Sequence, residues 1–154
     1  LTTLQSNGVQ LTEVTLHVGP GTFQPVECNR IEDHPMHEEK FSISDDAASI
    51  INRAKDEGRR VIAVGTTSMR VLESVGYGGM PIKPQIGRTD IFIFPPHEFQ
   101  VVDALVTNFH LPKSTLFILV NAFLGIKKAN ELYKLAIEKR YRLFSYGDCC
   151  LLFP

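Results

Sequence analysis

The stretch VVDALVTNFHLPKSTLFILVNAFLG, residues 101–125, decides what fold this sequence can adopt. Residues 101–106 are nearly all apolar, which is typical of a strand buried on both faces. Pro112 would end any strand and suits the first turn of a helix. Residues 114–124 are apolar on nearly every side, so we expect a helix that lies in the core. The stretch therefore predicts a buried strand, a polar turn and a core helix in succession.

The polar turn within this stretch is a candidate ligand site. Asn108, His110, Lys113 and Ser114 lie between the end of the predicted strand and the start of the predicted helix. Proteins of the α/β class place ligands at this position, outside the carboxyl ends of their sheet strands. The alternative is that these side chains only cap the helix and satisfy backbone groups. The sequence leaves both interpretations open.

Strands and helices alternate along the rest of the chain. The helix that follows Ser44 starts on a capping residue and ends at Gly58. Further segments are expected as strands at residues 9–18, 60–65, 89–94 and 144–153, and as helices at residues 66–74 and 127–142. This order predicts an α/β domain with a mostly parallel sheet flanked by helices.

Composition limits the class of protein. The 154 residues suffice for one domain with a real core, and a net charge of −1 gives no overall attraction to nucleic acid or membrane. Cys28, Cys149 and Cys150 are too few and wrongly spaced for a disulfide framework or a zinc site, so a reduced, intracellular protein is expected. No apolar run reaches the ~18–20 residues of a membrane span. Leu4 and Gly8 resemble the tail of a helix and its cap, which suggests the carboxyl-terminal piece of a longer protein.

A second polar cluster follows the predicted strand at residues 60–65. Thr66, Thr67 and Ser68 open the next helix, where hydroxyl and free backbone N–H groups can bind an anion such as a carboxylate. Arg70 is expected to add positive charge. The cluster matches neither a dinucleotide-binding nor a Walker pattern. Simple N-capping accounts for at least one of the hydroxyls and is the alternative.

Three of the histidines outside these clusters have candidate roles. His17 precedes a glycine-rich turn, where a structural role is the alternative to a catalytic one. His34 and His37 could suggest a metal site. No helix and no third ligand accompany them, so we expect no metal.

The only local excess of positive charge lies near the carboxyl end. Residues 127–142 carry six basic side chains against Glu131 and Glu138: Lys127, Lys128, Lys134, Lys139, Arg140 and Arg142. This segment is the best candidate for contact with nucleic-acid phosphates. The alternative is an ordinary solvated helix face.

Six local sequences, taken together, resemble one known family. They are TLHVGPGTFQPV, MHEEKF, RRVIAVGTTSMRVLES, TDIFIFP, the stretch of residues 101–125, and FSYGD. In this order, from about residue 14 to residue 148, they closely resemble the S-adenosylmethionine:tRNA ribosyltransferase-isomerase family of queuosine biosynthesis. The combination of NFHLPKSTL with GTTS and LHVGPGTF is highly specific.

The resemblance implies a bacterial cytoplasmic enzyme, expected to be a monomer. Members transfer and isomerise the ribosyl part of S-adenosylmethionine onto 7-aminomethyl-7-deazaguanine at the wobble position of tRNA, and the product is epoxyqueuosine. Members have an α/β domain and a β-barrel domain. Residues 1–154 would then be mainly the α/β domain, with remnants of the barrel domain, to which residues 14–43 are expected to connect.

Roles for individual residues follow from the chemistry that this resemblance implies. Thr66, Thr67 and Ser68 suit the methionine carboxylate or the ribose hydroxyls, and Asn108, Lys113 and Ser114 could orient ribose or adenine. The candidates for acid–base work are His17, Asp103 and His110, because His titrates near neutral pH. S-adenosylmethionine is already activated by its positive sulfur, so no metal is expected.

Two other functions are considered. A truncated α/β module could bind the ligand without performing chemistry. A methyltransferase that uses the same cofactor is disfavoured, because the turn after the first strand does not match the glycine-rich cofactor loop of such enzymes and no acid is evident at the end of the second strand.

Overall fold

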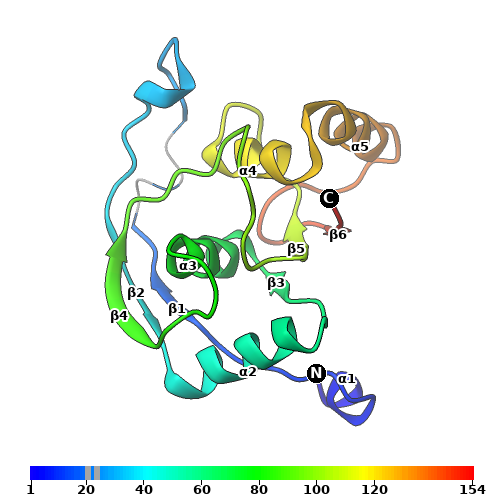
Figure 1. Cartoon of the computed structure of the whole chain (residues 1–154). Coiled ribbons are helices and arrows are strands. Elements are labelled where there is room, and N and C mark those ends of the chain that lie inside the picture. The colour runs from blue at the N-terminus through cyan, green and yellow to red at the C-terminus, as the bar shows by residue number, and fades with distance from the viewer. Residues whose placement is uncertain (20–21, 23–24) are drawn as a thin grey trace.

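The computed structural model describes residues 1–19, 22 and 25–154, and it contains two three-stranded sheets with helix α3 (Thr66–Gly76) between them (Figure 1). The first sheet has the order β1 (Thr15–His17), β2 (Glu39–Ile43) and β4 (Gln85–Thr89). Both of its pairings are antiparallel. Phe41 lies opposite Gly87, where a side chain would collide with the Phe41 ring.

The second sheet holds the stretch that was expected to organise the fold. Its central strand is β5 (Ala104–Asn108), with β3 (Ile62–Val64) on one side and β6 (Cys149–Leu152) on the other. β3 runs parallel to β5, and β6 runs antiparallel to it. The expected α/β class is confirmed. The expected parallel character is limited to β3 and β5, since the other described pairings are antiparallel.

The helices form where capping and periodicity predict them. Ser44 caps α2 (Asp45–Asp56) by accepting a hydrogen bond from the Ala47 N–H at 3.1 Å, and Gly58 follows with a φ of 67°. Gly8 likewise follows the first helix with a φ of 82°. Besides α3, the helices are α1 (Thr2–Ser6), α2 (Asp45–Asp56), α4 (Thr115–Leu124) and α5 (Ile126–Glu138), and a 3₁₀ turn spans Ile31–Asp33.

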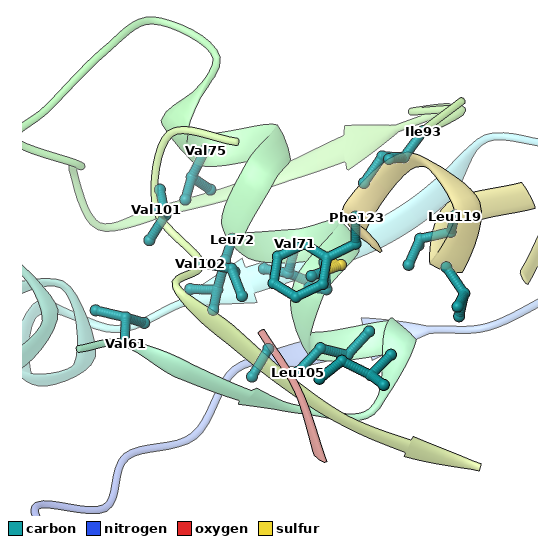
Figure 2. Close-up of a cluster of buried hydrophobic side chains, with 14 of the residues drawn as sticks. Val61, Val71, Leu72, Val75, Ile93, Val101, Val102, Leu105, Leu119 and Phe123 are labelled. Carbon is teal, nitrogen blue, oxygen red and sulfur yellow. The ribbon is translucent and has the colours of Figure 1, made fainter. Parts of the chain in front are cut away.

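The core lies where α3, β5 and α4 meet. Figure 2 shows Val71 and Leu72 of α3, Leu105 of β5 and Phe123 of α4 converging in one cluster, and all four are buried. Burial of such side chains contributes about 1.5–3 kcal/mol each to folding. The prediction of a core helix after the polar turn is confirmed.

Glu73 explains why β5 begins later than the apolar pattern suggested. Its buried carboxylate accepts hydrogen bonds from the backbone N–H groups of Gln100 (2.8 Å), Val101 (3.1 Å) and Val102 (2.9 Å). These donors are therefore not available to a strand ladder, and β5 starts at Ala104.

The strands expected at residues 9–18 and 89–94 are shorter or displaced. Of residues 9–18, only Thr15–His17 form β1, because β2 ends at Ile43 and leaves the earlier residues without a partner strand in the described chain. Residues 90–94 form no strand. Instead, the Thr89 hydroxyl accepts the Ile91 N–H at 3.1 Å, and the ladder of β4 ends at Thr89.

One face of β3 is open to solvent in the described residues. Ile62 and Val64 are 46% and 69% exposed, whereas Ala63 between them is buried. Among the helices of the described ranges, none is long and apolar enough to cross a bilayer. The connection of residues 14–43 to a barrel domain stays a prediction.

Candidate functional site

A pocket of about 470 Å³ lies at the carboxyl ends of the parallel strands β3 and β5. Its wall is built by the turn from β3 to α3, the connection from β5 to α4, Thr22, and the residues Phe144 and Ser145. Among the predicted site residues, the pocket brings together five: Thr66, Thr67, Asn108, His110 and Ser114. The pocket thus lies where the sequence predicted a ligand site, outside the carboxyl ends of the strands.

A larger hollow, of about 730 Å³, lies elsewhere and is not the candidate site. It runs along residues 8–14, α2 and the outer side of β3. Of the predicted site residues, only Ser68 contributes to its described wall. We assign the site to the smaller pocket because polar side chains converge there.

The start of α3 suits an anion. Gly65 has a φ of 89°, which favours glycine, and its N–H donates to the Val106 carbonyl at 2.8 Å. No described side chain caps this helix end. The backbone N–H groups of its first turn, next to Thr66 and Thr67, therefore remain available to a carboxylate or phosphate, assisted by the helix dipole.

Ser68 and Arg70 do not contribute to this anion site at the start of α3. The Ser68 hydroxyl donates back to the Val64 carbonyl at 2.9 Å, and Ser68 does not line the pocket. Arg70 is only 3% exposed, and it forms a buried ion pair with Glu39 of β2. The prediction that Arg70 adds positive charge to this anion site is therefore wrong, because Glu39 neutralises the Arg70 guanidinium.

The Arg70–Glu39 pair instead holds Thr22 in the pocket wall. The Thr22 hydroxyl donates to Glu39 Oε1 at 2.6 Å and accepts from Arg70 Nη1 at 3.2 Å. The Thr22 carbonyl accepts from the Thr115 hydroxyl of α4 at 3.1 Å. The Gly19 N–H also donates to Glu39, at 2.8 Å. Residues of β2, α3 and α4 thus fix one wall of the pocket.

Glu39 stays ionised in this network. Burial by itself raises the pKa of its carboxyl group, but hydrogen bonds from Thr22 and Gly19 and the charge of Arg70 outweigh burial. The net effect holds the pKa of Glu39 below its ordinary value.

His110 is a neutral imidazole in this pocket. Its Nε2 lies 2.9 Å from the Thr107 hydroxyl, and its backbone N–H donates to the Tyr133 hydroxyl at 2.9 Å. Burial lowers the pKa of His110 to about 4. At neutral pH the ring can therefore accept a proton or a hydrogen bond, but it holds no extra proton to release.

Tyr133 supports His110 from helix α5. Its ring makes edge contacts with Phe109 and Phe117, with centroid separations of 5.5 and 4.7 Å. Burial raises the pKa of its phenol to about 12, so the hydroxyl remains neutral. Sequence analysis missed this role, because Tyr133 follows the apolar period of its helix and nothing local links it to a residue 23 positions earlier.

Capping accounts for part of the polar turn. The Ser114 hydroxyl accepts from the Phe117 N–H at 3.1 Å and donates to the Leu111 carbonyl at 2.7 Å, so it is an N-cap that also lines the pocket. The Asn108 amide donates to the Asp148 carbonyl at 3.2 Å. Lys113 is exposed and lies outside the pocket wall.

The structure does not bring two other predicted residues to the pocket. Asp103 lies before the opposite end of β5, where it accepts hydrogen bonds from Lys55 Nζ (2.9 Å) and the Val61 N–H (2.8 Å). His17 is exposed on β1 and lies opposite Lys40. Most of the glycine-rich turn after His17, at residues 20, 21, 23 and 24, lies outside the described residues.

No cluster of three metal-ligating side chains occurs within residues 1–19, 22 and 25–154. His34 instead packs its ring against Phe92, with centroids 5.4 Å apart. All six basic residues of the segment 127–142 are exposed, and one of them, Arg142, pairs with Asp148 at 2.8 Å.

Comparison with known proteins assigns this arrangement to a family. The sequence profile of the queuosine biosynthesis protein family matches residues 1–152. The chain belongs to this family.

Individual members of the queuosine biosynthesis family are closely similar to the chain. The S-adenosylmethionine:tRNA ribosyltransferase-isomerase of Legionella pneumophila (strain Corby) is 55% identical over 99% of this chain and 45% of its own length. That of Rickettsia bellii (strain RML369-C) is 58% identical over 97% of this chain and 42% of its own length. The chain thus spans less than half the length of these curated relatives.

A solved structure shows the same fold. The crystal structure of S-adenosylmethionine tRNA ribosyltransferase from Thermotoga maritima superposes with a TM-score of 0.81 at 41% identity, and it matches 97% of this chain and 47% of the Thermotoga chain. The resemblance inferred from the six local sequences is therefore confirmed at the level of family and fold.

Proposed function

We propose that this chain forms the carboxyl-terminal part of an S-adenosylmethionine:tRNA ribosyltransferase-isomerase. The enzyme would transfer and isomerise the ribosyl group of S-adenosylmethionine onto 7-aminomethyl-7-deazaguanine in tRNA, giving epoxyqueuosine. The observation that carries the proposal is one pocket shared by the start of α3, which no described side chain caps, and the neutral imidazole of His110. The family relationship supplies the identity of the reaction.

The start of α3 would hold the methionine part of the substrate. A carboxylate needs several N–H or O–H donors, and the first turn of α3 offers backbone N–H groups beside the hydroxyls of Thr66 and Thr67. Arg70 cannot serve as a counter-charge, because its guanidinium is paired with Glu39. The proposal therefore assigns the carboxylate to the helix end alone.

His110 would handle a proton at the ribose. The positive sulfur of S-adenosylmethionine makes the adjacent C–H bonds more acidic, so a neutral base can remove a proton there. When the Nε2–H group donates to the Thr107 hydroxyl, Nδ1 carries the lone pair that accepts the proton. We propose no substrate contact for His17, Ser68, Asp103 or Lys113, and no metal in the reaction.

The basic segment of residues 127–142 is the proposed contact for tRNA phosphates. If its six exposed basic side chains meet phosphates, each lost contact lowers the slope of log K against log salt by about 0.7–0.9. We therefore expect Lys127→Gln with Lys134→Gln to reduce the slope by about 1.4–1.8 in tRNA binding by the full-length protein. An unchanged slope would show that the segment is only a solvated helix face.

The test of the proposed reaction uses S-adenosylmethionine labelled separately in its ribosyl and methyl groups. We expect the full-length protein to place ribosyl label on tRNA that carries the 7-aminomethyl-7-deazaguanine base, and the 154-residue chain alone to place none. Methyl label on the tRNA would instead indicate a methyltransferase. Binding without transfer by the full-length protein would support a module that only binds the ligand. A cytoplasmic monomer remains part of the proposal.

A further inference from the structure

The loop of residues 142–148 carries two exposed aromatic side chains beside the pocket. Phe144 is 55% exposed and lines the pocket, whereas Tyr146, two residues later, is 98% exposed and does not line it. An exposed aromatic ring that lines a cavity can pack against a ligand that occupies the cavity. Neither residue has a role in the function proposed above.

Hydrogen bonds between residues 142 and 148 close this loop. The Arg142 N–H donates to Asp148 Oδ2 at 2.8 Å, Arg142 Nη2 donates to Oδ1 at 2.8 Å, and the Asp148 N–H returns a hydrogen bond to the Arg142 carbonyl at 3.0 Å. Gly147 is required in this turn, because a Cβ atom there would overlap the carbonyl groups of Arg142 and Leu143. Asn108 ties the loop to the end of β5 through the Asp148 carbonyl.

The backbone of Phe144 has a strained conformation. Its φ is 67°, in the left-handed region that bulky residues rarely adopt. The conformation is fixed by hydrogen bonds from the Phe144 N–H to the Phe109 carbonyl (3.0 Å) and from the Gly147 N–H to the Phe144 carbonyl (2.8 Å). Such strain persists where the surrounding structure imposes it, and it concentrates at ligand-binding sites.

The chemistry of the wall indicates what the ring would contact. Among the described residues that line the pocket, Phe144 supplies the only phenyl or phenol ring. Apart from the imidazole of His110, the other side chains are threonines, short polar groups and aliphatic groups. A half-exposed ring that lines a polar pocket presents a flat apolar face to a ligand that fills the pocket. The flat groups that stack on such a face are aromatic rings, and nucleobases do so regardless of their hydrogen-bonding pattern.

We infer that Phe144 is a stacking platform for a purine-type ring at this pocket. The inference rests on the proposed function, which offers two such rings: the adenine of S-adenosylmethionine and the deazaguanine base of the tRNA. Both would present the same flat face to Phe144, so the two sources must be separated by experiment.

The experiment compares Phe144→Leu and Phe144→Tyr in the full-length protein, with Tyr146→Leu as the matched control on the same loop. Leu keeps apolar volume and removes the aromatic face, whereas Tyr keeps it. Equilibrium binding is measured separately for S-adenosylmethionine and for tRNA that carries the deazaguanine base, and thermal melting verifies folding. We expect Phe144→Leu to weaken one of these two ligands by about 5-fold to 150-fold, the range of one base–aromatic stack. Phe144→Tyr should stay within about threefold of the parent.

Each outcome decides the matter. A loss confined to S-adenosylmethionine supports stacking on adenine, and a loss confined to the tRNA supports stacking on the acceptor base. Phe144→Leu binding both ligands as well as the parent, or weakening them no more than Tyr146→Leu does, overturns the inference while the proposed function stands. A folded parent that binds neither ligand overturns both.

Discussion

His110→Gln in the full-length enzyme is expected to lower the rate of single-turnover ribosyl transfer by at least about a hundredfold, since general acid–base assistance is typically worth about 10²–10⁴ in rate. The amide of Gln can replace the hydrogen bond to the Thr107 hydroxyl, but it has no basic nitrogen lone pair and cannot accept the proton. The backbone hydrogen bond from residue 110 to the Tyr133 hydroxyl is kept. Folding should therefore survive the change.

The matched control is His37→Gln, because His37 is exposed and lies outside the pocket. It should retain parental turnover, and thermal melting should show both variants folded. A folded His110→Gln enzyme that turns over within about threefold of its parent would assign His110 a purely structural role, because a lost proton transfer costs far more.

Glu39→Gln is expected to destabilise the chain by about 3–5 kcal/mol, because removing one partner of a buried ion pair leaves the other charge uncompensated. Arg70 and Glu39 are each 3% exposed, and Glu39 also accepts hydrogen bonds from Thr22 and Gly19. The measurement is the free energy of unfolding from urea denaturation of the 154-residue chain.

The neighbouring residue provides the control. Glu38 pairs with Arg88 at 2.7 Å, but both side chains are more than half exposed. Glu38→Gln should therefore change the unfolding free energy by about 0–1 kcal/mol. Equal effects of the two substitutions would show that the buried pair does not organise the pocket wall.

Because of the same ion pair, the free energy of unfolding should decrease as the pH falls through the acidic range. The pKa of Glu39 is lower in the folded than in the unfolded chain, so the unfolded chain binds a proton first as the pH falls. The stabilisation from Glu39 is thus fully present above its unfolded pKa of about 4.3 and is lost as the pH falls through the lower, folded value. The difference in stability between the parent and Glu39→Gln should shrink over this range.

The sequence by itself determined the elements with strong local signals. Ser44 and Gly58 bound a helix because a capping hydroxyl and a glycine with positive φ act on their nearest neighbours along the chain. The apolar residues of α4 and β5 predicted a core helix and a central strand, because burial follows directly from apolar pattern. Polar residues were also predicted after β3 and β5. Because these strands are parallel, both groups line the same pocket.

Only the tertiary structure decided which polar side chains face the pocket and which form hydrogen bonds with backbone groups instead. Glu73 delays β5 by accepting N–H groups 27 to 29 residues away, and Glu39 pairs with Arg70 across 31 residues. Asp103 looked like a candidate acid beside the polar turn, yet the direction of β5 carries it to the opposite end of the strand. Thr22 and Tyr133 reach the site from elements far away in the chain. Hydrogen bonds and ion pairs of this range depend on how elements pack, and no local periodicity encodes that packing.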